Sequence, residues 1–224
     1  MSVAVVLVAG GQGRRLGAAE PKAFVMVGGA TLLEHALRRV LTASEVSHVV
    51  IVAPASHLEE AGAITSRSAR PADVDVVAGG SERSASVAAG LAALRRDDGI
   101  VLVHDAARAL APAELVSRLV HEVRSGHPAV VPGLPVTDTI KQVDADGVVV
   151  ATPDRAALRA VQTPQAFLRE VLQHAHASGA EATDDAALVE AAGGHVRVVP
   201  GDALAFKVTT PDDLALVERH LTQG

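Results

Sequence analysis

The residues best suited to chemistry stand in the stretch LVAGGQGRRLGAAEPKAF, residues 7–24. It follows an apolar run typical of a β-strand and combines several glycines with the cations Arg15 and Lys22. Glycines let backbone N–H groups approach a ligand closely, and open α/β sheets bind ligands at the carboxyl ends of their strands. The stretch therefore predicts an anion-binding loop. The simpler alternative is a surface turn with solvated arginines.

Two better-known phosphate loops do not fit this stretch. A P-loop needs a lysine directly after its last glycine, and no lysine follows a glycine here. A Rossmann fingerprint needs Gly-x-Gly-x-x-Gly, whereas the glycines of GQGRRLG are spaced one residue too far apart. What remains is a glycine loop with a cation at Arg15 and a second at Lys22, which follows Pro21. Two cations beside free amides suit a triphosphate better than a single phosphate.

The elements that position this loop alternate between short Val-rich runs and helical patterns. Such alternation favours a mostly parallel sheet covered by helices on both faces, an α/β fold. A capping-box pattern, Thr31 with Glu34, precedes the first helix. The predicted strands are residues 3–8, 48–53, 74–78, 100–104, 129–132, 196–199 and 204–208, and the predicted helices are 32–42, 84–95, 112–124, 168–178, 184–192 and a last one from Pro211.

One stretch interrupts the alternation. VTDTIKQVDADGVVVATPDR, residues 136–155, holds two β-rich runs joined around Asp146-Gly147, a strong hairpin signal. A hairpin inserted in a βαβ chain has no core of its own, and two-stranded hairpins are marginal alone. We therefore predict a single domain, residues 1–224, with a β-arm at about 136–154 that packs on a second subunit to form a homodimer.

Composition argues against several other classes of protein. The net charge of −6 disfavours general nucleic-acid binding, and the lack of Cys excludes disulfides and thiolate metal sites. No apolar stretch approaches the roughly 18 residues needed to span a bilayer, and the first residues lack the pattern of a secretion signal. His174 and His176 stand two apart and so do not share a helix face for a metal. We expect a soluble, cytoplasmic protein whose partners are small anions, with no nucleic acid and no membrane.

Further motifs place the chain near a known family. The first loop is similar to the signature loop of sugar-phosphate nucleotidyltransferases. The other motifs follow in order: AGGSERSASVAAGL (78–91), VLVHDAAR (101–108), DTIK (138–141), DR (154–155), VQTPQAF (161–167), TDDAALVE (183–190) and FKVTTPDDL (206–214). Together they resemble the 2-C-methyl-D-erythritol 4-phosphate cytidylyltransferase family over nearly the whole chain. This resemblance implies a Rossmann-like nucleotidyltransferase sheet and transfer of a cytidylyl group from CTP to methylerythritol phosphate, with release of pyrophosphate, in the non-mevalonate isoprenoid pathway.

The resemblance also implies which residues bind each substrate. The nucleotide would contact Ala9, Gly10, Gly11, Gly13, Arg15, Lys22, Gly80, Ser81, Ser86, Asp105 and Ala106. The acceptor would contact Asp105, Arg108, Thr139, Arg155, Thr163, Thr183 and Lys207. The catalytic cations would be Arg15, Lys22, Arg155 and Lys207, of which the last two position the acceptor phosphate.

Two of these residues have simpler alternatives. Asp105 ends a predicted strand at the ligand edge, where it is the best candidate to bind Mg²⁺ with the triphosphate. It could instead bind acceptor hydroxyls or cap a helix. The hydroxyl of Ser86 suits the polar edge of cytosine, whereas the plain interpretation of GGSERSAS is a helix N-terminus capped by Ser84.

Three rival functions stay open from the sequence. A ribitol-5-phosphate cytidylyltransferase shares the fold and most motifs. A molybdopterin guanylyltransferase has a similar first loop but would not be expected to carry VHDAAR or the hairpin. A non-catalytic nucleotide sensor is disfavoured, because binding alone would not require Arg155 and Lys207 as well as the cations of the first loop.

Overall fold

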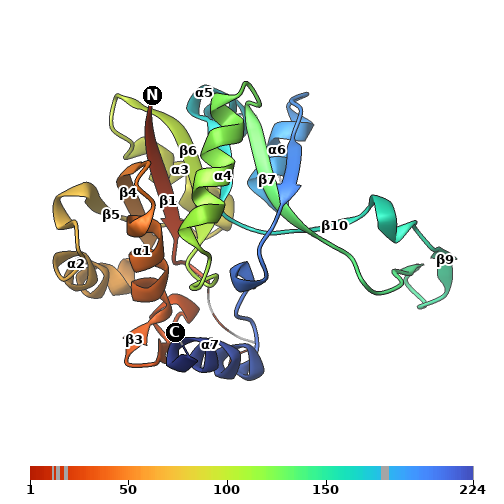
Figure 1. Cartoon of the computed structure of the whole chain (residues 1–224), viewed down its shortest axis with the longest axis horizontal. Helices are drawn as coiled ribbons and strands as arrows, with labels where there is room; N and C mark the ends of the chain where they lie inside the picture. The colour runs from red at the N-terminus through yellow and green to blue at the C-terminus, as the bar shows by residue number, and fades with distance from the viewer. Residues whose placement is uncertain (12, 14–15, 18–19, 178–181, 224) are drawn as a thin grey trace.

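The computed structural model describes residues 1–11, 13, 16–17, 20–177 and 182–223. Within these residues the chain forms an eight-stranded sheet of order β10-β7-β11-β6-β1-β4-β5, with β12 paired to β7. Helices flank the sheet, and β1 runs through its middle (Figure 1). The strands are β1 (Ser2–Val8), β4 (Val46–Ala53), β5 (Val74–Ala78), β6 (Asp98–Asp105), β7 (Ala129–Pro135), β10 (Arg159–Val161), β11 (Gln165–Leu168) and β12 (Arg197–Pro200).

Strand β1 shows how the sheet is covered on both faces. Val3, Val5 and Leu7 pack in one apolar core, and Ala4 and Val6 pack in another, because successive side chains of a strand point to opposite faces. The first core is completed by α1 (Leu32–Thr42), α2 (Leu58–Ser66) and α4 (Ala113–Arg124), and the second by α3 (Arg83–Ala92), α5 (Arg169–Ala177) and α6 (Asp185–Ala191). Since β1 also pairs in parallel with β4 and β6, the predicted α/β sheet is confirmed.

The sequence does not predict the antiparallel strands β10 and β11. Strand β11 lies between β6 and β7 and is antiparallel to both, while β10 pairs antiparallel with β7. A run of four residues is too short to show a period of two, and its first residue is polar. Gln165 is buried because its side chain binds Asp184 Oδ2 at 2.8 Å and the Ala186 amide at 3.2 Å.

The strand predicted at 204–208 is wrong. Asp202 accepts a hydrogen bond from the Leu204 amide at 2.8 Å and starts a short 3₁₀ turn, Ala203–Ala205. The Val208 amide then donates to Ala107 O at 2.8 Å, which ties the segment to the loop after β6 instead of to the sheet. The segment leads into α7 (Pro211–Gln223), which packs on the small sheet of β2 (Met26–Val27) and β3 (Ala30–Thr31).

The predicted helix starts have mixed outcomes. The capping box before α1 is confirmed, because the Thr31 hydroxyl accepts from the Glu34 amide and the Glu34 carboxylate accepts from the Thr31 amide. Ser84 does not cap α3. That helix begins at Arg83, so Ser84 lies inside its first turn and Glu82 occupies the N-cap position without a side-chain hydrogen bond.

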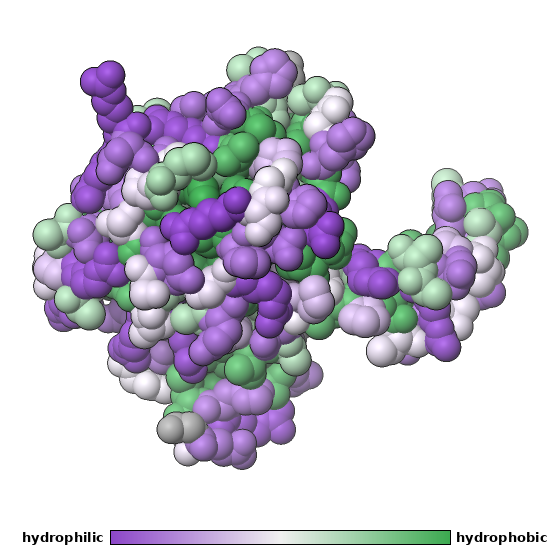
Figure 2. Space-filling model, turned by 45° about the horizontal axis from the view of Figure 1, so that its top comes forward, coloured by the Kyte–Doolittle hydropathy of each residue, from purple (hydrophilic) through white to green (hydrophobic). Residues whose placement is uncertain are grey.

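The hairpin predicted from Asp146-Gly147 is confirmed and projects from the body as an arm (Figure 1). It pairs β8 (Gln142–Val143) with β9 (Val149–Ala151), and Gly147 adopts φ 81° in the turn. Apolar side chains are exposed along it, and Figure 2 shows them as green patches on the arm. Val143, Val148, Val149 and Val150 are each more than half exposed.

Replacing Gly90 with Ala should lower the free energy of unfolding by about 1–3 kcal/mol, the usual cost of overpacking. Gly90 lies in α3, where a Cβ would overlap Val6 Cγ1 and lie 3.0 Å from Val52 Cγ2. Gly62 in α2 is a matched control, because nothing lies within 4 Å of its added Cβ and a helical Gly→Ala change should add about 1 kcal/mol. Urea unfolding measures both. A Gly90→Ala variant as stable as wild type would contradict the close packing of α3 on β1.

Candidate nucleotide and acceptor site

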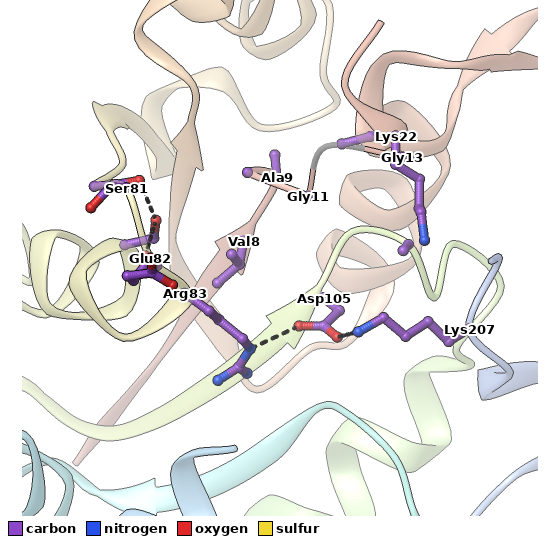
Figure 3. A pocket seen from close by; sticks show the side chains of 15 residues that line it. Val8, Ala9, Gly11, Gly13, Lys22, Ser81, Glu82, Arg83, Asp105 and Lys207 are labelled. Carbon is purple, nitrogen blue, oxygen red and sulfur yellow. Dashed lines mark hydrogen bonds and ion pairs between the residues drawn. The ribbon is translucent and has the colours of Figure 1, made fainter. Parts of the chain in front are cut away.

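A cavity of about 450 Å³ opens at the carboxyl ends of β1 and β6 (Figure 3). Residues from the first loop, from the start of α3, from the end of β6 and from the segment before α7 share its wall. The lining residues are Val8, Ala9, Gly10, Gly11, Gly13, Lys22, Ala23, Gly80, Ser81, Glu82, Arg83, Ser86, Asp105, Ala107 and Lys207. Segments that are far apart in the chain therefore meet at the sheet edge where the sequence predicts the ligand site.

Backbone hydrogen bonds fix both ends of the first loop. The Ala9 amide donates to Val52 O at 2.8 Å, and the Lys22 amide donates to Gly11 O at 2.9 Å. Gly13 has φ 63°, and a Cβ there would lie 3.3 Å from Lys22 N, so glycine is required at this close approach. Arg15, predicted to bind phosphates, lies outside the described residues.

Lys22 follows directly on this loop and is buried. It begins the short turn Lys22–Phe24, and its Nζ donates to Val208 O at 2.8 Å. Val208 stands beside Lys207 and is tied to the loop after β6 through Ala107. The C-terminal segment thus holds the ammonium of Lys22 at the cavity wall.

The second predicted nucleotide segment lies across the cavity from Lys22 (Figure 3). Gly80 packs tightly on the first turn of α3, because a Cβ there would lie 2.5 Å from Ala85 Cβ. Ser86 is buried, and its hydroxyl donates to Glu82 O at 3.0 Å. Gly80, Ser81 and Ser86 therefore present a close-fitting wall of backbone groups and two serine hydroxyls.

Asp105, at the end of β6, lies between two cations of the cavity (Figure 3). Lys207 Nζ is 2.7 Å from Asp105 Oδ2, and Arg83 Nε is 3.5 Å from Oδ1. Burial alone would raise the pKa of Asp105, but the charges of Lys207 and Arg83 outweigh it and lower the pKa to about 2. The carboxylate is therefore ionised at neutral pH.

The sequence alone does not predict a role for Arg83, although Arg83 stands inside the motif GGSERSAS. Arg83 lines the cavity and contacts two carboxylates, Asp105 and Asp185. The pKa of Arg83 is raised, because the charges of Asp185 and Asp105 outweigh the effect of burial. The local signal is an arginine inside the predicted nucleotide segment, between Ser81 and Ser86, but its partner Asp185 is 102 residues away in the chain.

Behind Asp105, Thr163 and His104 form a buried support. The Thr163 hydroxyl accepts from the Asp105 amide at 3.0 Å and also lies 3.0 Å from His104 Nδ1. Burial lowers the pKa of His104 to about 4, so the ring is neutral near pH 7 and can accept the Thr163 hydroxyl proton. Thr163 therefore holds the backbone of the site and does not line the cavity. Ala106, fully buried, likewise contributes through its amide, which donates to Val8 O at 3.0 Å.

The other predicted acceptor residues do not line this cavity. Arg108 is half-buried and donates to Ala205 O at 2.7 Å, and burial lowers its pKa. Thr139 and Arg155 are exposed on or beside the arm, where Arg155 Nη1 donates to Thr137 O at 2.6 Å. Thr183 is exposed just before α6. Within the described part of one chain, the structure brings Lys207 and Asp105 together in the cavity wall, which does not include Thr139, Arg155 or Thr183.

Two other kinds of feature are absent from the described residues. No group of three or more His, Asp or Glu side chains is arranged there to hold a metal ion. No helix in this part of the chain is long and apolar enough to cross a membrane.

The mostly parallel sheet, its glycine loop and the cations around Asp105 define an α/β nucleotidyltransferase fold with its cavity at the strand ends. Comparison with known proteins narrows this class. The chain belongs to the 2-C-methyl-D-erythritol 4-phosphate cytidylyltransferase family, whose model matches residues 3–223.

Individual relatives agree with this membership. The 2-C-methyl-D-erythritol 4-phosphate cytidylyltransferase of Nocardia farcinica is 54% identical over 98% of this chain and 94% of its own length. A bifunctional enzyme IspD/IspF of Clavibacter michiganensis is 55% identical over 96% of this chain, which spans only 53% of that relative. The crystal structure of the 2-C-methyl-D-erythritol 4-phosphate cytidylyltransferase from Thermus thermophilus superposes with a TM-score of 0.78 at 37% identity, covering 99% of this chain and 100% of that one.

Proposed function

We propose that this chain transfers the cytidylyl group of CTP to 2-C-methyl-D-erythritol 4-phosphate, giving 4-diphosphocytidyl-2-C-methyl-D-erythritol and pyrophosphate in isoprenoid precursor synthesis. Family membership carries the choice of substrates. The observation that carries the chemistry is a single cavity that combines a glycine loop, the buried cation Lys22 and the pair Asp105–Lys207. We also predict that the enzyme works in the cytoplasm.

The triphosphate of CTP would lie over the first loop. Gly10, Gly11 and Gly13 line the cavity beside Lys22, and Arg15 belongs to the same loop in the sequence. Cytosine would lie on the opposite wall, where backbone groups of Gly80 and Ser81 and the hydroxyl of Ser86 can match its polar edge. A wall packed this closely would also exclude a purine by size.

A magnesium ion fits the chemistry of this site. Magnesium takes one or two carboxylates and completes its shell with phosphate oxygens and water. Asp105 is ionised and lines the cavity, so it would hold the ion against the triphosphate. When bound, the metal would supply neutralisation of the negative charge that gathers around the α-phosphorus.

The reaction needs positioning and neutralisation more than proton transfer. The acceptor is a phosphate monoester with a second pKa of about 6, so it is mostly a dianion at neutral pH and needs no general base. Its oxygen attacks the α-phosphorus in line with the departing pyrophosphate. Lys22 and Arg15 would stabilise the developing charge. Lys207 and Arg155 would bind the acceptor phosphate and so offset its electrostatic repulsion from the nucleotide.

Pyrophosphate release tests this function directly. With CTP and Mg²⁺, methylerythritol phosphate should be turned over at least tenfold faster than ribitol 5-phosphate, and UTP should replace CTP poorly because its polar edge is reversed. Lys22→Ala should lower kcat by about 10²–10³-fold, which corresponds to a loss of about 2.7–4 kcal/mol of transition-state stabilisation. Faster turnover of ribitol phosphate would assign the chain to the alternative cytidylyltransferase. CTP binding without release for any polyol phosphate would indicate a nucleotide sensor.

We propose further that the chain works as one nucleotidyltransferase domain whose arm, residues 136–154, joins two copies into a homodimer. Four valines of the arm are more than half exposed, which favours burial on a partner. Thr139 and Arg155, expected at the acceptor, do not reach the cavity of their own chain. An arm that crosses a two-fold axis would bury the valines and bring Arg155 to the other subunit's site.

Mixing two inactive variants tests the shared site. Lys22→Ala and Arg155→Ala should each be nearly inactive as homodimers. In a mixed dimer both defects fall in one site, while the other keeps Lys22 from one chain and Arg155 from its partner. An equimolar, re-equilibrated mixture should therefore recover about a quarter of wild-type activity. If native mass spectrometry shows that subunits have exchanged and the mixture stays as inactive as its parents, Arg155 serves its own subunit and the shared-site model is wrong.

A further inference from the structure

A network of ion pairs leads from the cavity into the body of the protein. Lys207 pairs with Asp105, Asp105 with Arg83, and Arg83 Nη1 lies 2.7 Å from Asp185 Oδ2. The other oxygen of Asp185 lies 2.9 Å from His176 Nε2. Figure 3 shows the cavity end of this ion-pair network, with Asp105 between Arg83 and Lys207.

At its inner end, this ion-pair network is buried and fully hydrogen-bonded. Asp185 is fully buried at the start of α6, and both of its carboxylate oxygens are bound. A buried carboxylate is costly unless it is paired and hydrogen-bonded, so Asp185 requires its cation. The start of α6 is itself fixed by Gln165, which binds Asp184 and the Ala186 amide from β11. Arg83 is thus anchored on a fixed acceptor.

At its outer end, in the cavity, the ion-pair network is more exposed and has a longer contact. Lys207 has a side chain that is 42% exposed, whereas the side chains of Arg83 and Asp185 are 31% and 1% exposed. The contact from Arg83 Nε to Asp105 is 3.5 Å, longer than its 2.7 Å contact to Asp185. Arg83 can therefore keep its place on Asp185 while Lys207 and the cavity face of Asp105 exchange partners with substrates.

We propose that Arg83 is a positioning residue that holds the carboxylate of Asp105 in its working orientation, and that Asp185 acts on the reaction through Arg83. This assignment rests on the cytidylyl transfer proposed above. A planar guanidinium suits the role, because Nε and Nη1 reach two carboxylates from one rigid group, which an ammonium cannot do. Without Asp185, Arg83 would lose its closer carboxylate and would compete with substrates for Asp105.

The test measures kcat, the KM of the acceptor and the dissociation constant of CTP for Arg83→Gln, Arg83→Lys, Asp185→Asn and the double variant Arg83→Gln/Asp185→Asn. Arg83→Gln should lower kcat at least tenfold and should change the dissociation constant of CTP, measured without Mg²⁺, less than threefold. The kcat of Arg83→Lys should be less than threefold higher than that of Arg83→Gln, because lysine restores the charge but not the planar guanidinium. If Asp185 acts through Arg83, the double variant should be no slower than Arg83→Gln alone.

Arg70→Gln is the matched control for the loss of a half-buried arginine. Its side chain is 34% exposed and pairs with Asp73 at 2.8 Å, just before β5 and outside the cavity wall. It should keep kcat within twofold even where its melting temperature falls as much as that of Arg83→Gln. This comparison separates positioning from a general loss of stability.

The outcomes distinguish this assignment from the function on which it rests. A wild-type enzyme without pyrophosphate release would refute the proposed transfer itself. With an active wild type, Arg83→Gln within threefold of its kcat would overturn the positioning role. If the fold-losses in kcat of Arg83→Gln and Asp185→Asn multiply in the double variant, Asp185 acts independently of Arg83. A parallel loss of CTP affinity in the absence of Mg²⁺ would place Arg83 on the nucleotide and would also overturn the assignment.

Discussion

The ionised carboxylate of Asp105, held between Lys207 and Arg83, is the interaction on which the rest of the site depends. Asp105 ends β6, which pairs with β1 in the middle of the sheet, and its amide is held by Thr163 from the loop before β11. Two cations lower the pKa of this buried group to about 2, so that it stays charged at the cavity where we propose that the triphosphate binds. Without the cations, burial would favour the neutral acid.

This arrangement explains why distant parts of the chain converge on one cavity. Lys207 comes from the segment before α7, Arg83 from the first turn of α3, and Lys22 from the turn after the first loop. The C-terminal segment positions two cations of the cavity. It supplies Lys207, which binds Asp105, and the neighbouring carbonyl of Val208 accepts a hydrogen bond from Lys22. Docking of α7 on β2 and β3 is therefore part of how the site is positioned.

Much of the fold and of the site follows from local pattern, and the failures have physical causes. Strands β1, β4, β5 and β6 have local apolar signals, whereas β11 shows no period and buries Gln165 only through long-range hydrogen bonds. The motifs likewise predict most of the residues that line the cavity. They do not indicate the role of Arg83, because that role depends on Asp185, 102 residues away. A motif does indicate Arg155, yet Arg155 lies beside the arm, outside the cavity wall. Motifs specify which residues matter, but they do not specify where a residue beside an exposed arm lies relative to the cavity.

The most direct test is a crystal structure of the protein with Mg²⁺ and a non-hydrolysable CTP analogue. We expect the triphosphate over residues 10–13 in contact with Lys22, and cytosine against Gly80, Ser81 and Ser86. We also expect Asp105 to face the metal while Arg83 keeps its contact with Asp185. A nucleotide bound outside this cavity, or one whose triphosphate lies away from Lys22 and Asp105, would contradict the central claim that these charges form a triphosphate site.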